Sequence, residues 1–382
     1  MSKIRPVAFY LPQYHPIPEN NLWWGKGFTE WTNVAKAKPL FKGHYQPHLP
    51  ADLGYYDLRI AEVREEQARM AREHGIYGFC YYHYWFNGTR LLERPFSEVA
   101  ESGKPDFPFM LCWANENWSR TWDGGDNEIL MKQEYSEQDA ESHSRLLLQY
   151  FKDSRYIKVD GKPVFVIYKP NLITNLEAYV RVLRREAEKE GLFLYLCRVE
   201  NENKFRTDIL SKQFDAAIEF QPQSEILYDF MHVCLQNKIH NNLKQRIYNK
   251  VLRSFGYGSR VRDIIRNSQW NLNYSHYVDY VRQHYEYPKE YKRFPGVTPM
   301  WDNTARRGRD SFLFYNATPQ KYQQWLQYHL QNFKPYSRDE NFIFINAWNE
   351  WAEGNHLEPC REWGNQYLQA TKEILQKHAV EI

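Results

Sequence analysis

The chain has little of several features that often identify the class of a protein. Its five cysteines are odd in number and include no CxxC pair, which fits neither a disulfide framework nor a cysteine zinc site and predicts reduced, mostly buried thiols. The 50 Lys and Arg residues are nearly balanced by 47 Asp and Glu residues, so the net charge of +3 gives no reason to expect a nucleic-acid partner. No apolar run is as long as a membrane span, and no signal-peptide segment precedes Pro6. We therefore expect a cytoplasmic protein, with contact at a membrane surface as an option.

Aromatic residues, in contrast, are abundant. They make up 17% of the chain and include 13 Trp and 29 Tyr, more than a core requires. Tyr and Trp offer a flat apolar face with a polar tip, which suits the C–H faces and hydroxyl rims of sugar rings. Because cores and protein interfaces use the same residues, the composition favours a carbohydrate ligand without requiring one.

Eight short runs rich in Val, Ile, Phe and Tyr recur along the chain, and segments with helical spacing separate most of them. Their nearly continuous hydrophobicity is typical of parallel strands buried on both faces. Eight such units predict an α/β fold, a (β/α)8 TIM-type barrel. The alternative is a doubly wound open sheet, but no glycine-rich phosphate turn follows the first run. The predicted strands lie within 6–14, 75–85, 107–117, 162–170, 192–199, 215–220, 295–303 and 341–348, and predicted helices at 58–74, 137–152 and 176–190.

The connection between the sixth and seventh predicted strands, residues 221–294, is too long for an ordinary barrel loop. We expect a single catalytic domain over residues 1–382, with 221–294 as a helical insertion within it. Inside the insertion, residues 236–262 contain seven Lys and Arg residues, no acidic residue and apolar side chains at four-residue steps, which predicts a basic amphipathic helix. This helix either packs its apolar stripe on the barrel or docks on an anionic membrane or a lipid-linked glycan.

Polar and aromatic residues follow most of the predicted strands, as in LPQYH, YHYWFNG, WANENW, WDN and WNEWAEG. In a barrel, the carboxyl ends of all strands meet at one rim, where the active site of this fold is built. The clusters therefore predict a glycan or sugar-donor site at that rim. The residues expected to bind substrate are Tyr10, Gln13, Tyr14, Trp24, Glu30, Trp31, Tyr82, Trp85, Trp113, Asn115, Glu116, Asn117, Trp301, Asp302, Asn303, Trp348 and Asn349.

Two glutamates after the last strand are the candidate catalytic residues. Glycosidic chemistry needs a proton donor for the leaving oxygen and a second carboxylate that assists its displacement. Glu350 and Glu353 are three residues apart, which on a helical turn places them on one face. The neighbouring Trp348 and Trp351 can raise the pKa of the acid by excluding water. The alternative interpretation is that both glutamates stabilise the N-terminus of a helix.

Glu116 is a rival carboxylate at the end of the third strand. It could act as acid or base opposite Glu350, although a role as a hydrogen-bond acceptor for substrate is the expectation that we retain. His44 and His48 are four residues apart, but Pro47 argues against a helix that would align them as metal ligands. We expect no metal and no cofactor.

Five motifs together resemble a known family. They are the long segment that begins YLPQYHPIPENN, then GFCYYHYWFNG, LCWANENW, PMWDNTARR and INAWNEWAEGNHLEP. The chain resembles the glycoside hydrolase family 99-like domain of the WbsX type, a group described as glycosyltransferases of bacterial surface-polysaccharide clusters. The resemblance covers nearly the whole chain except residues 221–294.

The resemblance implies a (β/α)8 barrel related to endo-α-mannosidases, which act with retention and without a metal. It also implies that Glu350 assists the 2-hydroxyl of the sugar in attacking the anomeric carbon, giving a 1,2-anhydro intermediate, and that Glu353 protonates the leaving oxygen. Three functions stay open: a retaining glycosyltransferase of O-antigen or capsular polysaccharide synthesis, a retaining endo-acting glycoside hydrolase, and a non-catalytic glycan-binding barrel.

Overall fold

The computed structural model describes residues 4–120, 125–201, 212–241, 270–309 and 311–381. Parallel strands form a nearly closed barrel. Each strand pairs with the next barrel strand along the chain and the last pairs with the first, except at the seventh position, where two short strands each pair on one side only. This confirms the (β/α)8 barrel and makes the doubly wound open sheet wrong, because the strands follow one another in chain order around the sheet and the last pairs with the first. The barrel strands are β1 (Arg5–Tyr10), β2 (Gly78–Phe86), β4 (Phe109–Trp113), β8 (Lys162–Ile167), β9 (Tyr195–Glu200), β10 (Ala216–Glu219), β12 (Arg293–Phe294), β13 (Gly296–Val297) and β15 (Phe342–Ile345).

The seventh strand position is split into β12 and β13 at Pro295. β12 pairs with β10 on one side, and β13 pairs with β15 on the other. Pro295 has no N–H to donate, but its carbonyl accepts from Phe344 N at 2.9 Å. At Gly296 a Cβ atom would come within 2.3 Å of the Glu219 carbonyl, so only glycine lets the two strands approach at this seam.

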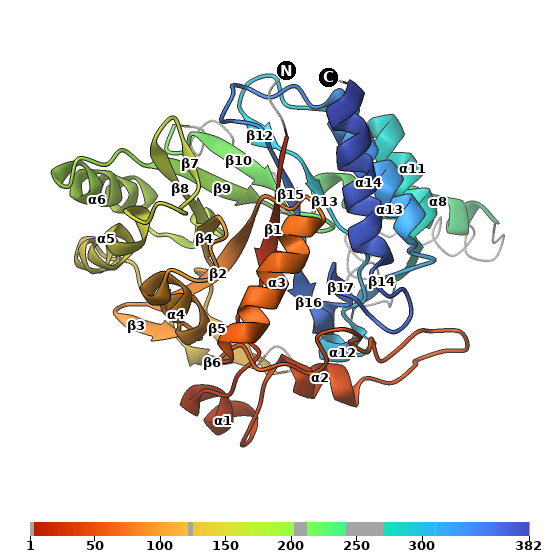
Figure 1. Cartoon of the computed structure of the whole chain (residues 1–382). Coiled ribbons are helices and arrows are strands. Elements are labelled where there is room, and N and C mark those ends of the chain that lie inside the picture. The colour runs from red at the N-terminus through yellow and green to blue at the C-terminus, as the bar shows by residue number, and fades with distance from the viewer. Residues whose placement is uncertain (1–3, 121–124, 202–211, 242–269, 310, 382) are drawn as a thin grey trace, which may run out of the picture.

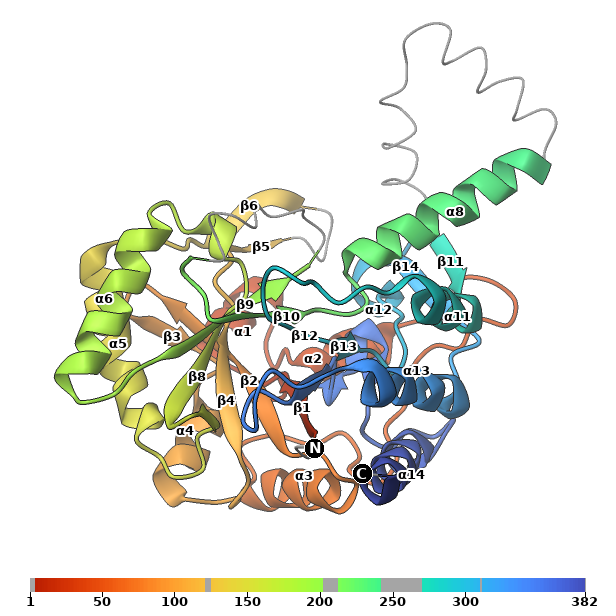
Figure 2. The same ribbon diagram turned by 90° about the horizontal axis from the view of Figure 1, so that it is seen from above.

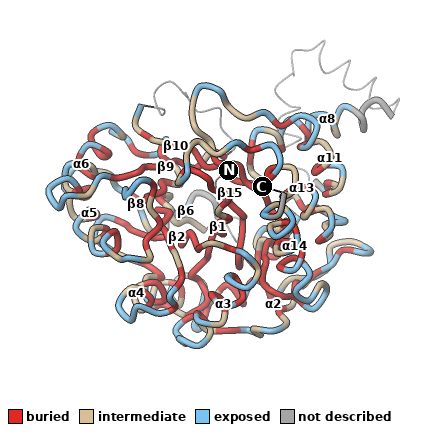
Figure 3. The backbone as a smooth tube through the Cα atoms, turned by 45° about the horizontal axis from the view of Figure 1, so that its top comes forward, coloured by how far each residue is buried: buried red, intermediate tan, exposed pale blue. Residues whose placement is uncertain are grey.

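The strands are buried along nearly their whole length, as the apolar runs predict. All nine residues of β2 and all five of β4 are buried. Inward side chains fill the barrel while outward ones pack against the helices. Figure 3 shows this buried centre, with exposed residues on the outer helices and loops.

Helices form the outer layer (Figure 1). Three predicted helices are confirmed as α3 (Ala61–Glu73), α5 (Glu137–Phe151) and α6 (Leu176–Lys189), and the others are α4 (Arg94–Ser102), α13 (Pro319–Asn332) and α14 (Gln366–Glu381). Side chains cap several N-termini: Ser136 accepts from Asp139 N, Asn175 from Ala178 N, and Thr318 from Lys321 N.

The insertion between β10 and β12 contributes α8 (Glu225–Asn241), β11 (Trp270–Asn273) and α11 (Tyr274–His284). Figure 2 shows α8 projecting from the rest of the molecule. Residues 236–241 of the predicted basic helix belong to α8, and residues 242–262 lie outside the described residues. Within the described ranges, no helix combines the length and the hydrophobicity that crossing a bilayer requires.

Short elements connect the barrel strands to the outer helices, and several of them build the rim. These are α1 (Pro18–Trp24), α2 (Glu30–Lys36), β3 (Thr89–Leu91), β5 (Trp118–Arg120), β6 (Gly125–Met131), β7 (Lys158–Val159), η2 (Pro170–Leu172), α12 (Thr304–Arg307), β14 (Phe312–Tyr315), β16 (Asn349–Glu350), η3 (Trp351–Glu353) and β17 (Asn355–His356). The five cysteines, all within the described residues, form no disulfide.

Candidate active site

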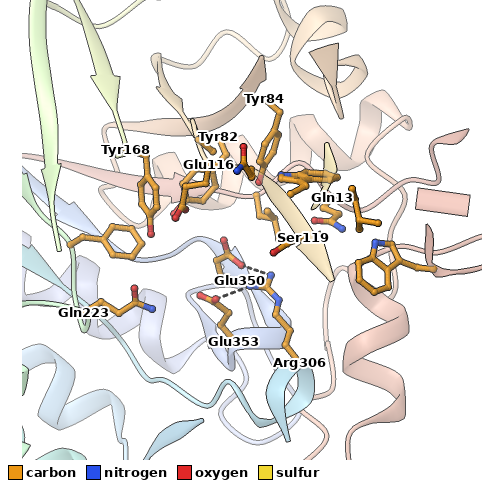
Figure 4. A pocket seen from close by; sticks show the side chains of 17 residues that line it. Gln13, Tyr82, Tyr84, Glu116, Ser119, Tyr168, Gln223, Arg306, Glu350 and Glu353 are labelled. Atoms are coloured by element: carbon orange, nitrogen blue, oxygen red, sulfur yellow. Dashed lines mark hydrogen bonds and ion pairs between the residues drawn. The ribbon is translucent and has the colours of Figure 1, made fainter. Parts of the chain in front are cut away.

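A cavity of about 340 Å³ lies at the carboxyl ends of the barrel strands. β2 itself and the segments that follow β1, β4, β8, β10, β13 and β15 each contribute to its wall, so residues far apart in the sequence meet there. Figure 4 shows Tyr82, Tyr84, Tyr168 and Glu116 facing Glu350 and Glu353 across the cavity. The lining residues are Leu11, Gln13, Trp24, Tyr82, Tyr84, Ala114, Glu116, Asn117, Trp118, Ser119, Leu130, Tyr168, Phe220, Gln223, Arg306, Glu350 and Glu353.

Arg306 holds the two candidate catalytic carboxylates together. Its Nη2 lies 2.8 Å from Glu350 Oε2, and its Nη1 lies 2.7 Å from Glu353 Oε1. The same guanidinium pairs with Glu30, which is completely buried behind it. A planar guanidinium can bind several carboxylate oxygens at fixed angles, so it fixes the orientation of both glutamates.

A tight turn brings the two glutamates to the same side. Glu350 ends β16, and Glu353 ends the single 3-10 turn η3, in which residues three apart lie above one another. Gly354 follows with φ +53°, and a Cβ atom there would lie 2.7 Å from the Cβ of Asp302. The Asp302 N–H donates to the Glu353 carbonyl at 2.7 Å. Glycine therefore allows the turn to pack directly against the segment after β13.

Burial and neighbouring carboxylates raise the pKa of both glutamates. Burial is the largest cause for Glu350, whose pKa rises to about 8; Arg306 lowers it, and the charges of Glu353 and Glu30 raise it further. The pKa of Glu353 is also raised, first by burial, against the lowering effect of Arg306. Arg306 alone pairs with three carboxylates, of which Glu30 and Glu350 are buried and Glu353 is partly buried, so the cluster favours holding a proton at neutral pH.

Several substrate-binding candidates do line this cavity. Gln13 and Trp24 enter from the segment after β1, Tyr82 from β2, and Glu116 and Asn117 from the segment after β4. Glu116 lies 3.9 Å from Lys169 Nζ, and its side chain is 47% exposed. It is therefore at the mouth of the cavity rather than inside the Arg306 cluster.

Other candidates lie outside the cavity and hold the fold together. The hydroxyl of Tyr10 donates to Gln67 on α3, and that of Tyr14 donates to the Asn349 carbonyl. The Asn349 side chain bridges to the backbone of Leu11. These side chains fasten the barrel to its outer layer or join the first strand to the last.

The remaining tryptophans and Asn115 also make internal contacts. Trp31 Nε1 donates to the Tyr56 carbonyl, Trp85 Nε1 to Asp139 and Trp113 Nε1 to the Trp85 carbonyl. Trp348 is fully buried and packs against Phe79, and Asn115 bonds to the backbone of Lys169. Trp301 and Asp302 line a separate cavity, and Asn303 directly precedes α12 as its N-cap residue.

The sequence interpretation missed Arg306 and part of the aromatic wall. Arg306 lies in PMWDNTARR, which was read only for Trp301, Asp302 and Asn303. Tyr84, Tyr168 and Gln223 were also missed, although they lie in β2 or follow β8 and β10. Their position at or just after the carboxyl end of a barrel strand was the signal in the sequence that could have identified them as cavity residues.

Glu358, the third carboxylate in the motif INAWNEWAEGNHLEP after Glu350 and Glu353, is part of the core. It is buried and accepts from Tyr56 OH, Gln67 Nε2 and Trp351 Nε1 at 2.6–2.8 Å. Within the part of the chain that the structure describes, no three His, Cys, Asp or Glu side chains come together as around a metal ion. His44 instead pairs with Asp302 at 2.7 Å, and His48 with His356 at 3.3 Å.

Known proteins share this fold. A family 99 endo-α-mannosidase from Bacteroides thetaiotaomicron superimposes with a TM-score of 0.56 over 98% of both chains, at 12% identity. A glycoside hydrolase-like protein superimposes with a TM-score of 0.57 over 98% of this chain and 94% of the other, at 15% identity. At these identities the likeness concerns the fold.

Sequence comparison assigns the family. The sequence profile of the family described as "Glycosyltransferase WbsX" matches residues 6–371. The uncharacterised protein WxcX from two strains of Xanthomonas campestris pv. campestris is 38% identical over 97% of this chain. The chain spans 49% of the length of these curated relatives. The chain therefore belongs to the WbsX glycosyltransferase family of carbohydrate-active enzymes.

Proposed function

We propose that this chain transfers a glycosyl group at an α-glycosidic bond with retention, as a glycosyltransferase of bacterial surface polysaccharide synthesis, either O-antigen or capsular. The observation that carries the proposal is the pair Glu350 and Glu353, which share Arg306 inside a cavity at the strand ends. Two adjacent carboxyls with raised pKa values supply the acid and base functions that glycosyl transfer requires. The aromatic wall suits the apolar faces of a sugar.

In the proposed mechanism, which the resemblance to family 99 endo-α-mannosidases implies, Glu350 takes the proton of the sugar 2-hydroxyl. At the same time Glu353 protonates the leaving oxygen. The 2-oxygen then bonds to the anomeric carbon as the bond to the leaving oxygen breaks. In the second step Glu353 removes a proton from the incoming hydroxyl, whose oxygen bonds to the anomeric carbon. The bond between that carbon and the 2-oxygen breaks, and Glu350 returns its proton to the 2-oxygen. The two inversions together give retention.

The second candidate is a retaining endo-acting hydrolase. Its support is the common fold of this chain and the endo-α-mannosidase of B. thetaiotaomicron. The two functions differ only in whether water or a sugar hydroxyl accepts the glycosyl group. Incubation with nucleotide sugars, lipid-linked glycans or free α-glycans, followed by mass analysis of the products, distinguishes them.

Conservative substitution tests the catalytic pair. We expect Glu350→Gln and Glu353→Gln each to lower turnover by a factor of about 10² to 10⁴, because each removes proton transfer while keeping the shape of the site. Glycan binding should be retained, which calorimetric titration would measure. Glu116→Gln is the matched control, since it changes a carboxylate at the cavity mouth, and it should have a smaller effect. Undiminished turnover in either member of the pair would exclude it from the chemistry.

A further inference from the structure

A second cavity, of about 570 Å³, lies on the other side of the catalytic turn. Glu353 lines the first cavity, and the next residue, Gly354, lines the second. The two cavities therefore share a wall, formed by this turn and by Asp302, whose N–H donates to the Glu353 carbonyl at 2.7 Å. Around the second cavity are the loop after α2, β14 and the segment before α14, which Figure 1 shows on one side of the molecule.

Two buried polar groups at this cavity have no hydrogen-bond partner among the described residues. They are Trp301 Nε1 and the hydroxyl of Tyr367, and the two residues are only 1% and 2% exposed. A buried donor that makes no hydrogen bond destabilises the folded protein, because it has lost its bond to water without replacing it. Both are donors that a ligand oxygen could satisfy, and they lie on different elements of the wall.

The polar groups beside them are already paired. His44 Nδ1 accepts from Leu40 N, and its Nε2 pairs with Asp302 Oδ2 at 2.7 Å. Asp302 Oδ1 accepts from the Thr304 N–H and hydroxyl. The His44–Asp302 pair is therefore a fixed part of the wall, whereas the donors of Trp301 and Tyr367 still lack a partner among the described residues.

Aromatic rings at the edge of the cavity complete the site. Tyr45 is 36% exposed and Tyr315 is 42% exposed, and Trp363 is half-buried beside Tyr367, with ring centroids 6.2 Å apart. Exposed rings above buried hydrogen-bond donors match a sugar, which offers C–H faces to rings and hydroxyl oxygens to donors.

We propose that this second cavity binds a neutral oligosaccharide, with Trp301 Nε1 and the Tyr367 hydroxyl donating to its oxygens. The proposed ligand is distinct from the glycosyl unit at Glu350 and Glu353, and its binding needs no turnover. The position of the cavity behind Gly354 and Asp302 places a bound chain next to the catalytic turn.

Tyr367→Phe tests this proposal because it removes only the unpaired hydroxyl. Calorimetric titration with mannotetraose and cellotetraose is carried out on the Ala114→Trp protein, in which the new side chain fills the first cavity that Ala114 lines. We expect binding to persist in that protein and to weaken about 3- to 10-fold on adding Tyr367→Phe, the loss of one hydrogen bond. The Tm should stay equal or rise, since a buried unpaired hydroxyl is lost.

Tyr55→Phe is the matched control, because Tyr55 is 54% exposed and lines neither cavity, and it should leave binding unchanged. The Glu350→Gln protein, which keeps the native wall, repeats the comparison in case Ala114→Trp disturbs folding. Both cavities are open in that protein, so the titration should show two binding phases. Tyr367→Phe should weaken only the phase that belongs to the second cavity. Loss of all binding in a folded Ala114→Trp protein, or affinity for both tetrasaccharides that is insensitive to Tyr367→Phe, would overturn the proposal.

Discussion

At the scale of single residues, the distinctive feature is one arginine among three carboxylates. Arg306 is 10% exposed, and its partners Glu30, Glu350 and Glu353 are 0%, 6% and 16% exposed. In such surroundings, water screens the repulsion between carboxylates poorly. The balance of charge in this cluster therefore depends on pH within the physiological range.

Thermal stability should fall as pH rises from about 5 to 8. The pKa of Glu350 in the folded protein is about 8, above its ordinary value, so in this interval the native state holds a proton that the unfolded state has released. Glu358, whose pKa rises to about 7 through burial, acts in the same direction. We expect Glu350→Gln to reduce this slope and to raise the Tm by about 2 °C or more at pH 8.

Melting curves of the Glu350→Gln and wild-type proteins across this pH range provide the measurement. Glu65→Gln, a change at an exposed carboxylate, is the control and should leave the slope unaltered. An identical pH dependence in Glu350→Gln would mean that Glu350 is ionised in the folded protein.

Substrates with different leaving groups separate the roles of the two glutamates. The proposed mechanism makes Glu353 the acid, whereas the pKa of about 8 for Glu350 favours a proton on Glu350 in the empty site. An aryl leaving group needs little protonation. We therefore expect an aryl glycoside to restore first-step activity to Glu353→Gln, measured as release of the phenol, and not to Glu350→Gln. The opposite pattern would reverse the assignment.

At the scale of elements, the site depends on a turn rather than on a regular helix. The predicted helical turn at Glu350 and Glu353 is a strand end followed by a single 3-10 turn, and Gly354 ends it in the left-handed region. Asp302 contacts this turn and also accepts from Thr304 N at the start of α12, the helix that carries Arg306. The carboxylates and their cation are therefore positioned by the same contact.

Gly354→Ala should reduce both stability and activity. It adds the strain of a positive φ, and its Cβ would lie 2.7 Å from Asp302 Cβ and 3.0 Å from the Asp302 backbone nitrogen. Gly364→Ala is a matched control, since its φ of +54° is nearly the same and no atom lies within 4 Å of the added Cβ. We expect both variants to lose about 1 kcal/mol or more through backbone strain, measured as Tm. Only Gly354→Ala should also lower kcat/KM, by about 10-fold or more, and equal kcat/KM values in the two variants would argue against steric positioning.

At the scale of the whole molecule, the barrel is compact and the segment between β10 and β12 extends away from it. The barrel is nearly closed at the split seventh strand, and α8 projects from the rest of the molecule (Figure 2). Residues 242–262, which hold most of the basic side chains of the predicted helix 236–262, lie outside the described residues. Contact of this segment with an anionic membrane or lipid-linked glycan therefore stays a prediction from the sequence.

Co-sedimentation with phosphatidylglycerol vesicles tests that prediction. Reversal of charge at Lys244, Arg246 and Lys250 to Glu should weaken vesicle binding by more than about 100-fold, because each basic residue near an anionic surface contributes about 1 kcal/mol and each new glutamate is repelled by it. The matched control reverses three lysines on the barrel that are 55–68% exposed, namely Lys132, Lys152 and Lys189, and should have little effect. Unchanged sedimentation of the first variant would remove the membrane hypothesis.

The sequence by itself determined the eight barrel strands and the family, and it singled out Glu350 and Glu353 as the candidate pair. Hydrophobic runs are local, and a change from apolar to polar residues marks the strand ends where this fold builds its site. Glu350 and Glu353 could be recognised because they are close in sequence and share one turn.

Only the tertiary structure decided which residues surround that pair. Glu30 and Arg306 are 276 positions apart, and Arg306 and Glu350 are 44 apart, so nothing local in the sequence indicates their contact. Successive strand residues point to opposite faces. In strands that are buried on both faces, the hydrophobic pattern does not distinguish the residues that face the barrel interior from those that face the helices. For this reason Tyr82 lines the cavity while Tyr10 contacts α3, although both follow the same sequence pattern.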